Sequence, residues 1–206
     1  MALAGRLAWE SNKSGRSNLM IFVSRPSIPT DIPKYTLHQY LWGFFPQTTR
    51  DSPRPFVFLA NNDRVVVVSS IEPKTAFKEA SLNAGMSYSI DAIIAPGKSE
   101  SQGFRKDGVG PKSKKIPITG NAKRRKWLGD LLEKNGISLV HCHWFDRNPL
   151  RFKHGDGNVI RVFPARVTAI ISVFDAPAAE RLITTGIGRS RAFGCGLLYI
   201  PELMDN

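Results

Sequence analysis

The stretch PFVFLANNDRVVVVSSI (residues 55–71) contains two runs of apolar and β-branched residues around the polar triplet NND. Runs of this length and composition, at 55–60 and 64–71, are typical of β-strands. Asn and Asp at 61–63 tolerate the backbone angles of a tight turn. The stretch therefore predicts a β-hairpin, and the fold follows from the segments that flank it.

The segments on either side of this hairpin extend it to a βαββαβ unit. LMIFV (19–23) is a further strand signal. Apolar residues at helical spacing predict a helix over 31–45. A proline in the first turn and a glycine just past the end predict a second helix over 73–84. YSIDAIIA (88–95) follows as a strand, and this order is that of the ferredoxin-like fold.

The second half of the chain repeats this order in topology rather than in sequence. Its expected elements are a strand at 115–118, a helix at 121–136 with Asn121 as N-cap, strands at 137–144 and 158–174, a helix at 175–186 with Asp175 as N-cap, and a strand at 192–200. The sequence thus predicts an α+β protein with two ferredoxin-like (βαββαβ) domains in tandem. The predicted parts are an N-terminal extension (1–18), a first domain (19–95), a basic linker (96–115) and a second domain (116–206).

The chain carries a large excess of positive charge, with 29 Lys and Arg against 17 Asp and Glu. Residues 96–126 hold ten basic side chains and two acidic ones. Such a surplus favours a polyanionic partner, although a solvated, flexible surface is the alternative. The run at 123–126 opposes the dipole at the start of a helix, which favours nucleic acid. The candidate RNA-binding residues in this part and in a second basic segment between two strands (146–158) are Lys112, Lys114, Lys115, Lys123, Arg124, Arg125, Lys126, Arg147, Arg151 and Lys153.

The remaining composition excludes several classes of protein. Two distant cysteines, Cys142 and Cys195, form no disulfide framework and indicate a reducing, cytoplasmic setting. No apolar run reaches the length of a membrane span. His141 and His143 would share one face of a strand and Cys142 the other, so their spacing does not indicate a zinc site. No carboxylate pair or phosphate-binding loop is recognisable, and we expect neither a metal nor another cofactor.

A glycine-rich segment, TTGIGRSRAFGCGLLYI (184–200), lies near the C-terminus. A dinucleotide-binding fingerprint needs a strand before its glycines and a helix after them, and here the order is reversed. One interpretation is a helix C-cap at Gly186 followed by a turn. The other is a backbone surface that RNA approaches closely, with Arg189 and Arg191 on phosphates.

His38 lies in an apolar helical segment, KYTLHQYLWGFFP (34–46). The leucines and phenylalanines cover one sector of the helix, and Tyr35, His38 and Trp42 form an adjacent stripe. A histidine at such an edge can take the proton of an RNA 2′-hydroxyl or protonate the 5′-oxygen leaving group, while a phenol beside it stabilises charge. From helical geometry alone, a structural histidine is the better interpretation.

Four segments together resemble the CasE family, the CRISPR repeat-processing endoribonucleases of Cascade-type complexes. They are YTLHQYLWGFFP (35–46), KKIPITGNAKRRKWLGDLLEKNG (114–136), VFPARVTAIISVFDAPAAERLITTGIG (162–188) and GIGRSRAFGCGLLYI (186–200). The similarity extends over about residues 19–201. It implies a RAMP-type pair of ferredoxin-like domains, and it matches the family's catalytic histidine to His38 and the neighbouring tyrosine to Tyr35.

The resemblance also implies an activity and partners. The expected activity is metal-independent cleavage of precursor CRISPR RNA at the repeat hairpin, leaving a 2′,3′-cyclic phosphate and a 5′-hydroxyl. The expected partners are that hairpin, which stays bound after cleavage, and the other subunits of a class 1 CRISPR effector complex. A non-cleaving hairpin-binding subunit is the main alternative. A ribosome-associated or DNA-binding protein is a further one, but it leaves the pairing of Tyr35 with His38 unexplained.

Overall fold

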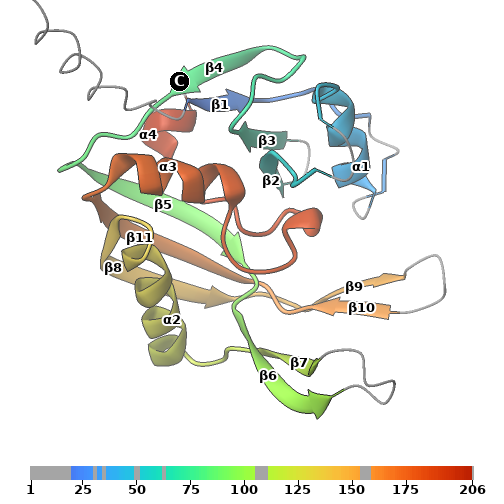
Figure 1. Cartoon of the computed structure of the whole chain (residues 1–206), viewed down its shortest axis with the longest axis vertical. Coiled ribbons are helices and arrows are strands. Elements are labelled where there is room, and N and C mark those ends of the chain that lie inside the picture. Colours follow the sequence, from blue (N-terminus) through green and yellow to red (C-terminus); the bar gives the residue numbers. More distant parts are fainter. Residues whose placement is uncertain are drawn as a thin grey trace, which may run out of the picture.

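The computed structural model describes residues 20–29, 32–33, 36–48, 52–61, 64–104, 111–153 and 159–205. The predicted N-terminal extension lies outside these residues. The predicted hairpin is present as β2 (Phe56–Asn61) and β3 (Arg64–Ser69). With β1 (Ile21–Ser24) and β4 (Phe77–Ala80) it forms an antiparallel sheet in the order β2-β3-β1-β4 (Figure 1). The sheet therefore contains the two strands that decided the prediction, paired in the expected way.

The predicted helix at 73–84 is wrong, because this segment supplies β4. Residues 77–80 pair with β1 in antiparallel register, Phe77 opposite Ser24 and Ala80 opposite Ile21. The rings of Phe22 and Phe77 meet edge to face at 5.2 Å. Pairing with the free edge of β1 satisfies the backbone of both strands, and this tertiary gain outweighs a weak helical preference.

The predicted helix at 31–45 is shorter than expected. Its described part is α1 (Leu37–Leu41), followed by a single turn of 3₁₀-helix, η1 (Trp42–Phe44). Leu37, Leu41 and Phe45 are buried against one face of the β2–β3 hairpin, in a cluster with Phe56, Phe58, Val65 and Val67. The apolar sector of the helix thus faces the core as predicted, and the stripe that carries His38 lies beside it.

A second sheet has the order β5-β11-β8, from β5 (Ser87–Ile94), β11 (Ala165–Val173) and β8 (Ile137–Asp146). Tyr199 forms an isolated antiparallel bridge to Asp91 on the free edge of β5. The strand expected at 88–95 in the first domain is therefore part of the second sheet, where it pairs with β11 along its whole length. The two sheets together have the tandem ferredoxin-like arrangement, with β4 rather than β5 as the fourth strand of the first.

Two hairpins extend from the second sheet (Figure 1). One pairs β6 (Gly97–Phe104) with β7 (Pro111–Pro117), and the other pairs β9 (Leu150–Lys153) with β10 (Val159–Val162). The segment at 96–115 was expected as a linker or long loop without regular structure, and its described residues instead pair as strands. The predicted division of the chain into two independently folding domains stays a prediction.

The helices of the second unit begin and end close to the predicted positions. α2 (Asn121–Glu133) starts one residue early, with Gly120 in the N-cap position instead of Asn121. α3 (Ala176–Thr185) has the predicted cap, because the Ala178 N–H donates to Asp175 Oδ1 at 3.1 Å. The strand expected at 192–200 is wrong at its start, where η2 (Arg191–Phe193) is a 3₁₀ turn. Its remainder forms only the isolated bridge of Tyr199 and leads into the short α4 (Pro201–Met204).

One large cluster of buried apolar residues joins the two units. It combines buried residues of β1, β2 and β3 with those of β5, β8, β11, α2 and α3. α3 packs against β2 and β3 as well as lying beside β5 (Figure 1). Its buried Glu180 accepts a hydrogen bond from the Leu82 N–H at 2.9 Å, and burial raises the pKa of this carboxyl.

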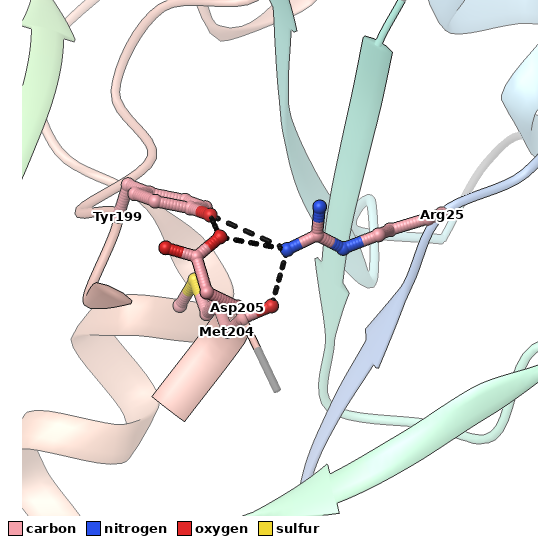
Figure 2. Close-up of polar contacts among 4 residues, drawn as sticks. All are labelled: Arg25, Tyr199, Met204 and Asp205. Atoms are coloured by element: carbon pink, nitrogen blue, oxygen red, sulfur yellow. Dashed lines mark hydrogen bonds and ion pairs between the residues drawn. The ribbon is translucent and has the colours of Figure 1, made fainter. Parts of the chain in front are cut away.

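A polar cluster ties the C-terminus to the first sheet (Figure 2). The guanidinium of Arg25, directly after β1, donates to the Met204 carbonyl, to Asp205 Oδ1 (3.0 Å) and to the Tyr199 hydroxyl (3.3 Å). The Tyr199 hydroxyl in turn donates to Asp205 Oδ1. We call these four residues the C-terminal clamp, since they hold α4 against the strand at the other end of the chain.

Candidate nucleic-acid interface

His38 is half-buried on α1, beside the leucines that anchor this helix to the first sheet. α1 also packs against η2. This packing brings the histidine segment next to the glycine-rich segment, although the two are distant in the sequence. Tyr35 lies outside the described residues, so its predicted pairing with His38 stays a prediction.

The glycines of the C-terminal segment are required by close packing. Gly186 closes α3 as predicted, but a Cβ there would lie 2.7 Å from Val57 Cγ2 on β2. At Gly196 a Cβ would lie 2.3 Å from the Ile187 carbonyl oxygen. Both residues have positive φ, which only glycine adopts without strain. The glycines therefore allow the loop to fold back on itself and onto β2, and they set the position of η2.

A cleft of about 870 Å³ opens beside η2. Its walls come from η1, the segment just before β2, the residues just after β5, the end of β7, β10, and the loop around η2. Its polar and aromatic lining includes Trp42, Arg54, Arg161, Phe163, Arg189, Arg191 and Phe193. No Asp or Glu is among the residues that line it, within the part of the chain that the structure describes. Four arginines without a carboxylate favour the binding of an anion in this cleft.

Two of these arginines were predicted and two were missed. Arg189 donates to Ser99 Oγ at 2.9 Å, and Arg191 donates to the Thr185 carbonyl at 2.7 Å. Arg54 and Arg161 were not among the predicted candidates. The pairing of β9 with β10 could have identified Arg161, because it lies directly opposite Arg151. Nothing in the sequence around Arg54 indicates that it reaches η2.

The β9–β10 hairpin presents like charges side by side. Arg151 is exposed and faces Arg161 across the two strands, a placement that is unfavourable without an anion nearby. Phe152 stacks on Phe193 at 4.4 Å, which fixes the base of the hairpin against η2. Arg147 is exposed just before the hairpin. Lys153 is the last residue of β9, and its side chain lies outside what the structure describes.

The basic run of α2 divides into two groups. Lys123, Arg125 and Lys126 are exposed, and Lys126 pairs with Asp130 one turn later at 3.0 Å. Arg124 is instead 9% exposed. Its guanidinium pairs with Asp146 Oδ1 at 2.7 Å, donates to the Ile118 carbonyl, and lies 5.8 Å from the ring centre of Trp144. This placement argues against contact of Arg124 with RNA and gives it a structural role.

The lysines of the β6–β7 hairpin are less completely described. Lys114 is exposed on β7, opposite Glu100. Lys112 and Lys115 lie on the same strand, and their side chains are outside the described atoms. On β8, His141 and His143 are exposed while Cys142 packs against the core. Among the described residues, no group of three or more His, Cys, Asp or Glu side chains is placed to hold a metal ion. No helix in the described ranges is long and apolar enough to cross a membrane.

Residues 23–201 match a family model described as "CRISPR associated protein". The chain is 27% identical over 186 residues to the CRISPR system Cascade subunit CasE of Escherichia coli strain K12, covering 82% of this chain and 92% of that protein. The crystal structure of Cas6e from E. coli K-12 superposes with a TM-score of 0.64 at 22% identity, covering 87% and 98% of the two chains. Thermus thermophilus Cse3, bound to an RNA representing a pre-cleavage complex, gives 0.65 at 16% identity, covering 88% and 98%.

Proposed function

Because the chain belongs to the CRISPR associated protein family, we propose that it is an endoribonuclease that cleaves precursor CRISPR RNA at the repeat hairpin. The observation that carries the proposal is the packing of α1, with His38, against η2 at the edge of an arginine-lined cleft. A general acid–base group beside an anion site is the arrangement that RNA cleavage by internal attack requires. The similarity to CasE and to RNA-bound Cse3 supports the choice of substrate.

In the proposed reaction the RNA supplies its own nucleophile. The 2′-oxygen forms a bond to the adjacent phosphorus as its proton leaves, and the bond from phosphorus to the 5′-oxygen breaks as that oxygen gains a proton. The products are a 2′,3′-cyclic phosphate and a 5′-hydroxyl. His38 transfers one of the two protons, and Tyr35 orients the phosphate or stabilises its charge. This route needs no metal-bound hydroxide, because the attacking oxygen belongs to the substrate.

After cleavage the hairpin stays bound, held by the exposed cations of α2 and of the two hairpins. These include Lys114, Lys123, Arg125, Lys126 and Arg151. An A-form stem offers mainly its phosphates and its shape to such side chains. We propose that the protein and its guide RNA then join the other subunits of a class 1 effector complex, as the name of the Cascade subunit CasE indicates for that relative.

Incubation with candidate repeat RNAs in excess EDTA, followed by mapping of the product ends, tests this function. We expect cleavage to persist in EDTA and to stop when the scissile 2′-hydroxyl is replaced by hydrogen. Activity lost in EDTA and restored by magnesium would rule out the mechanism. Tight binding without cleavage would instead assign the protein as a hairpin-binding subunit.

A further inference from the structure

Two arginines from distant parts of the chain converge in the cleft. Arg54 enters from the segment just before β2 and Arg191 from η2. Desolvation by burial, with a smaller contribution from the charge of Arg191, lowers the pKa of Arg54 to about 10. Neither guanidinium has an ion-pair partner among the described residues. Bringing two cations together away from water costs free energy, and a bound anion would remove that cost.

The fold holds each of the two side chains in place without neutralising it. The Arg54 guanidinium lies 5.4 Å from the ring centre of Phe56, whose edge-to-face partner is Trp42 at 5.6 Å. Arg191 is held by its hydrogen bond to the Thr185 carbonyl. Ser190, directly before it, is in the left-handed region with φ of 63°, the only described non-glycine residue with positive φ. Such backbone strain at a residue that aims an arginine into a cleft is characteristic of a functional site.

The position of the pair relates it to His38. Trp42 is one helical turn after His38 on the same stripe, and it contacts Phe56, the ring that Arg54 covers. η2, which carries Arg191, packs on the same short helix. The two arginines are thus linked to the helix of His38, Arg54 through Phe56 and Trp42, and Arg191 through η2.

We infer that Arg54 and Arg191 together bind one phosphate group of the RNA backbone, next to the phosphate that is cleaved. The inference rests on the proposed function for the identity of the RNA, but the anion site itself is defined by the two side chains. One phosphate can accept hydrogen bonds from both guanidinium groups, which are planar donors suited to its geometry. Binding there fixes the strand relative to α1.

A thermodynamic cycle with single methylphosphonate linkages tests the contact. Each linkage near the cleavage position of a 2′-deoxy-blocked hairpin is neutralised in turn, and affinity is measured for the wild type, Arg54→Gln, Arg191→Gln and the control Arg181→Gln. Arg181 is exposed on α3 and does not line the cleft. We expect that neutralising one particular linkage weakens binding about tenfold in the wild type and in Arg181→Gln, which corresponds to the loss of a charged hydrogen bond. The same neutralisation should have little effect in Arg54→Gln and in Arg191→Gln. Equal losses at every linkage in all four proteins would overturn the inference.

A second measurement decides the anion site without RNA. Titration with inorganic phosphate is followed by the side-chain N–H signals of arginine in the nuclear magnetic resonance spectrum. Selective shifts of the Arg54 and Arg191 signals, with the Arg181 signal unchanged, support the site. They do so even if the protein neither binds nor cuts a repeat hairpin, in which case the proposed function alone fails. If the wild type binds phosphate no differently from the Arg54→Gln, Arg191→Gln double variant, and the losses from linkage and side-chain changes are additive in the cycle, the two arginines do not form a phosphate site.

Discussion

His38 is the residue on which the proposed chemistry depends. His38→Ala is expected to lower the single-turnover cleavage rate by about 10²–10⁴-fold, because a general acid–base group acts mainly in the transition state. Hairpin affinity, measured by filter binding, should stay within a few-fold of the wild type. Gln39→Ala, an exposed neighbour on α1, is the control. Cleavage by His38→Ala at the wild-type rate would show that His38 is not the general acid–base group.

The burial of Arg124 could have been predicted from helical spacing. Arg124 lies four residues before Leu128, which is fully buried, so its side chain falls on the inner face of α2. The sequence identified it only as part of a basic run. Its partners, Asp146 and the ring of Trp144, come from β8 and could not be known before that strand was paired with its neighbours.

Arg124→Ala should therefore act on stability more than on RNA binding. The variant loses its hydrogen bonds to Asp146 and Ile118, and we expect the free energy of unfolding, measured in urea, to fall by about 1–3 kcal/mol. The acidic partner is largely exposed, which keeps the cost below that of a fully buried pair. Arg125→Ala is the matched control. A large loss of hairpin affinity with unchanged stability would contradict the structural role.

At the scale of the element, the outer face of α2 is expected to bind the RNA stem. Replacing Lys123, Arg125 and Lys126 together by Ala should weaken hairpin binding and reduce the slope of affinity against salt by about 2–3, close to the number of phosphates that these side chains would neutralise. A triple variant of Lys74, Lys134 and Arg181, all exposed outside the proposed RNA-binding residues, is the control. Equal losses of hairpin affinity in the two triple variants would mean that these side chains act through the overall positive charge of the protein and not through specific contacts with the stem.

The segment 73–84 shows why one element could not be predicted. Pro73 and Gly85 mark its ends in the way that a helix would, and no apolar period decides between helix and strand. What decides is the unoccupied edge of β1, a feature of the assembled sheet and not of the local sequence. In contrast, the Asp175 cap and the β2–β3 hairpin depend on neighbouring residues only, and both were predicted correctly.

At the scale of the whole molecule, the tandem topology could be predicted from the sequence. The sheet to which β5 belongs could not. The pattern of β5 fits a strand in either unit, because its alternating buried residues suit any half-buried sheet. Its partner β11 lies in the other half of the chain. The arginine-lined cleft has the same origin: it exists only where η1, the segment before β2, β10 and η2 meet, and no single segment contains it.

The C-terminal clamp joins the two units, and its stability should depend on pH. The hydrogen bond from Tyr199, together with Arg25, lowers the pKa of Asp205 in the folded protein. A carboxyl with a depressed pKa contributes stability above its unfolded pKa of about 4, and this contribution is lost as the pH falls through the folded value. Because Arg25 and Asp205 are half exposed, solvent screening limits the contribution to about 0.5–1 kcal/mol.

Urea unfolding of Arg25→Gln at pH 7 and near pH 3 measures this contribution. At pH 7 the variant should be less stable than the wild type by that amount, with a midpoint of thermal unfolding about 1–4 °C lower. Near pH 3, below the unfolded pKa of about 4, the difference should shrink, because protonation of Asp205 competes with its ion pair to Arg25. Arg64→Gln, which removes an exposed charge from β3, controls for the change in net charge. A deficit of equal size at both pH values would mean that Arg25 stabilises the protein through its bonds to the Met204 carbonyl and the Tyr199 hydroxyl, and that the clamp holds the two units together independently of the charge on Asp205.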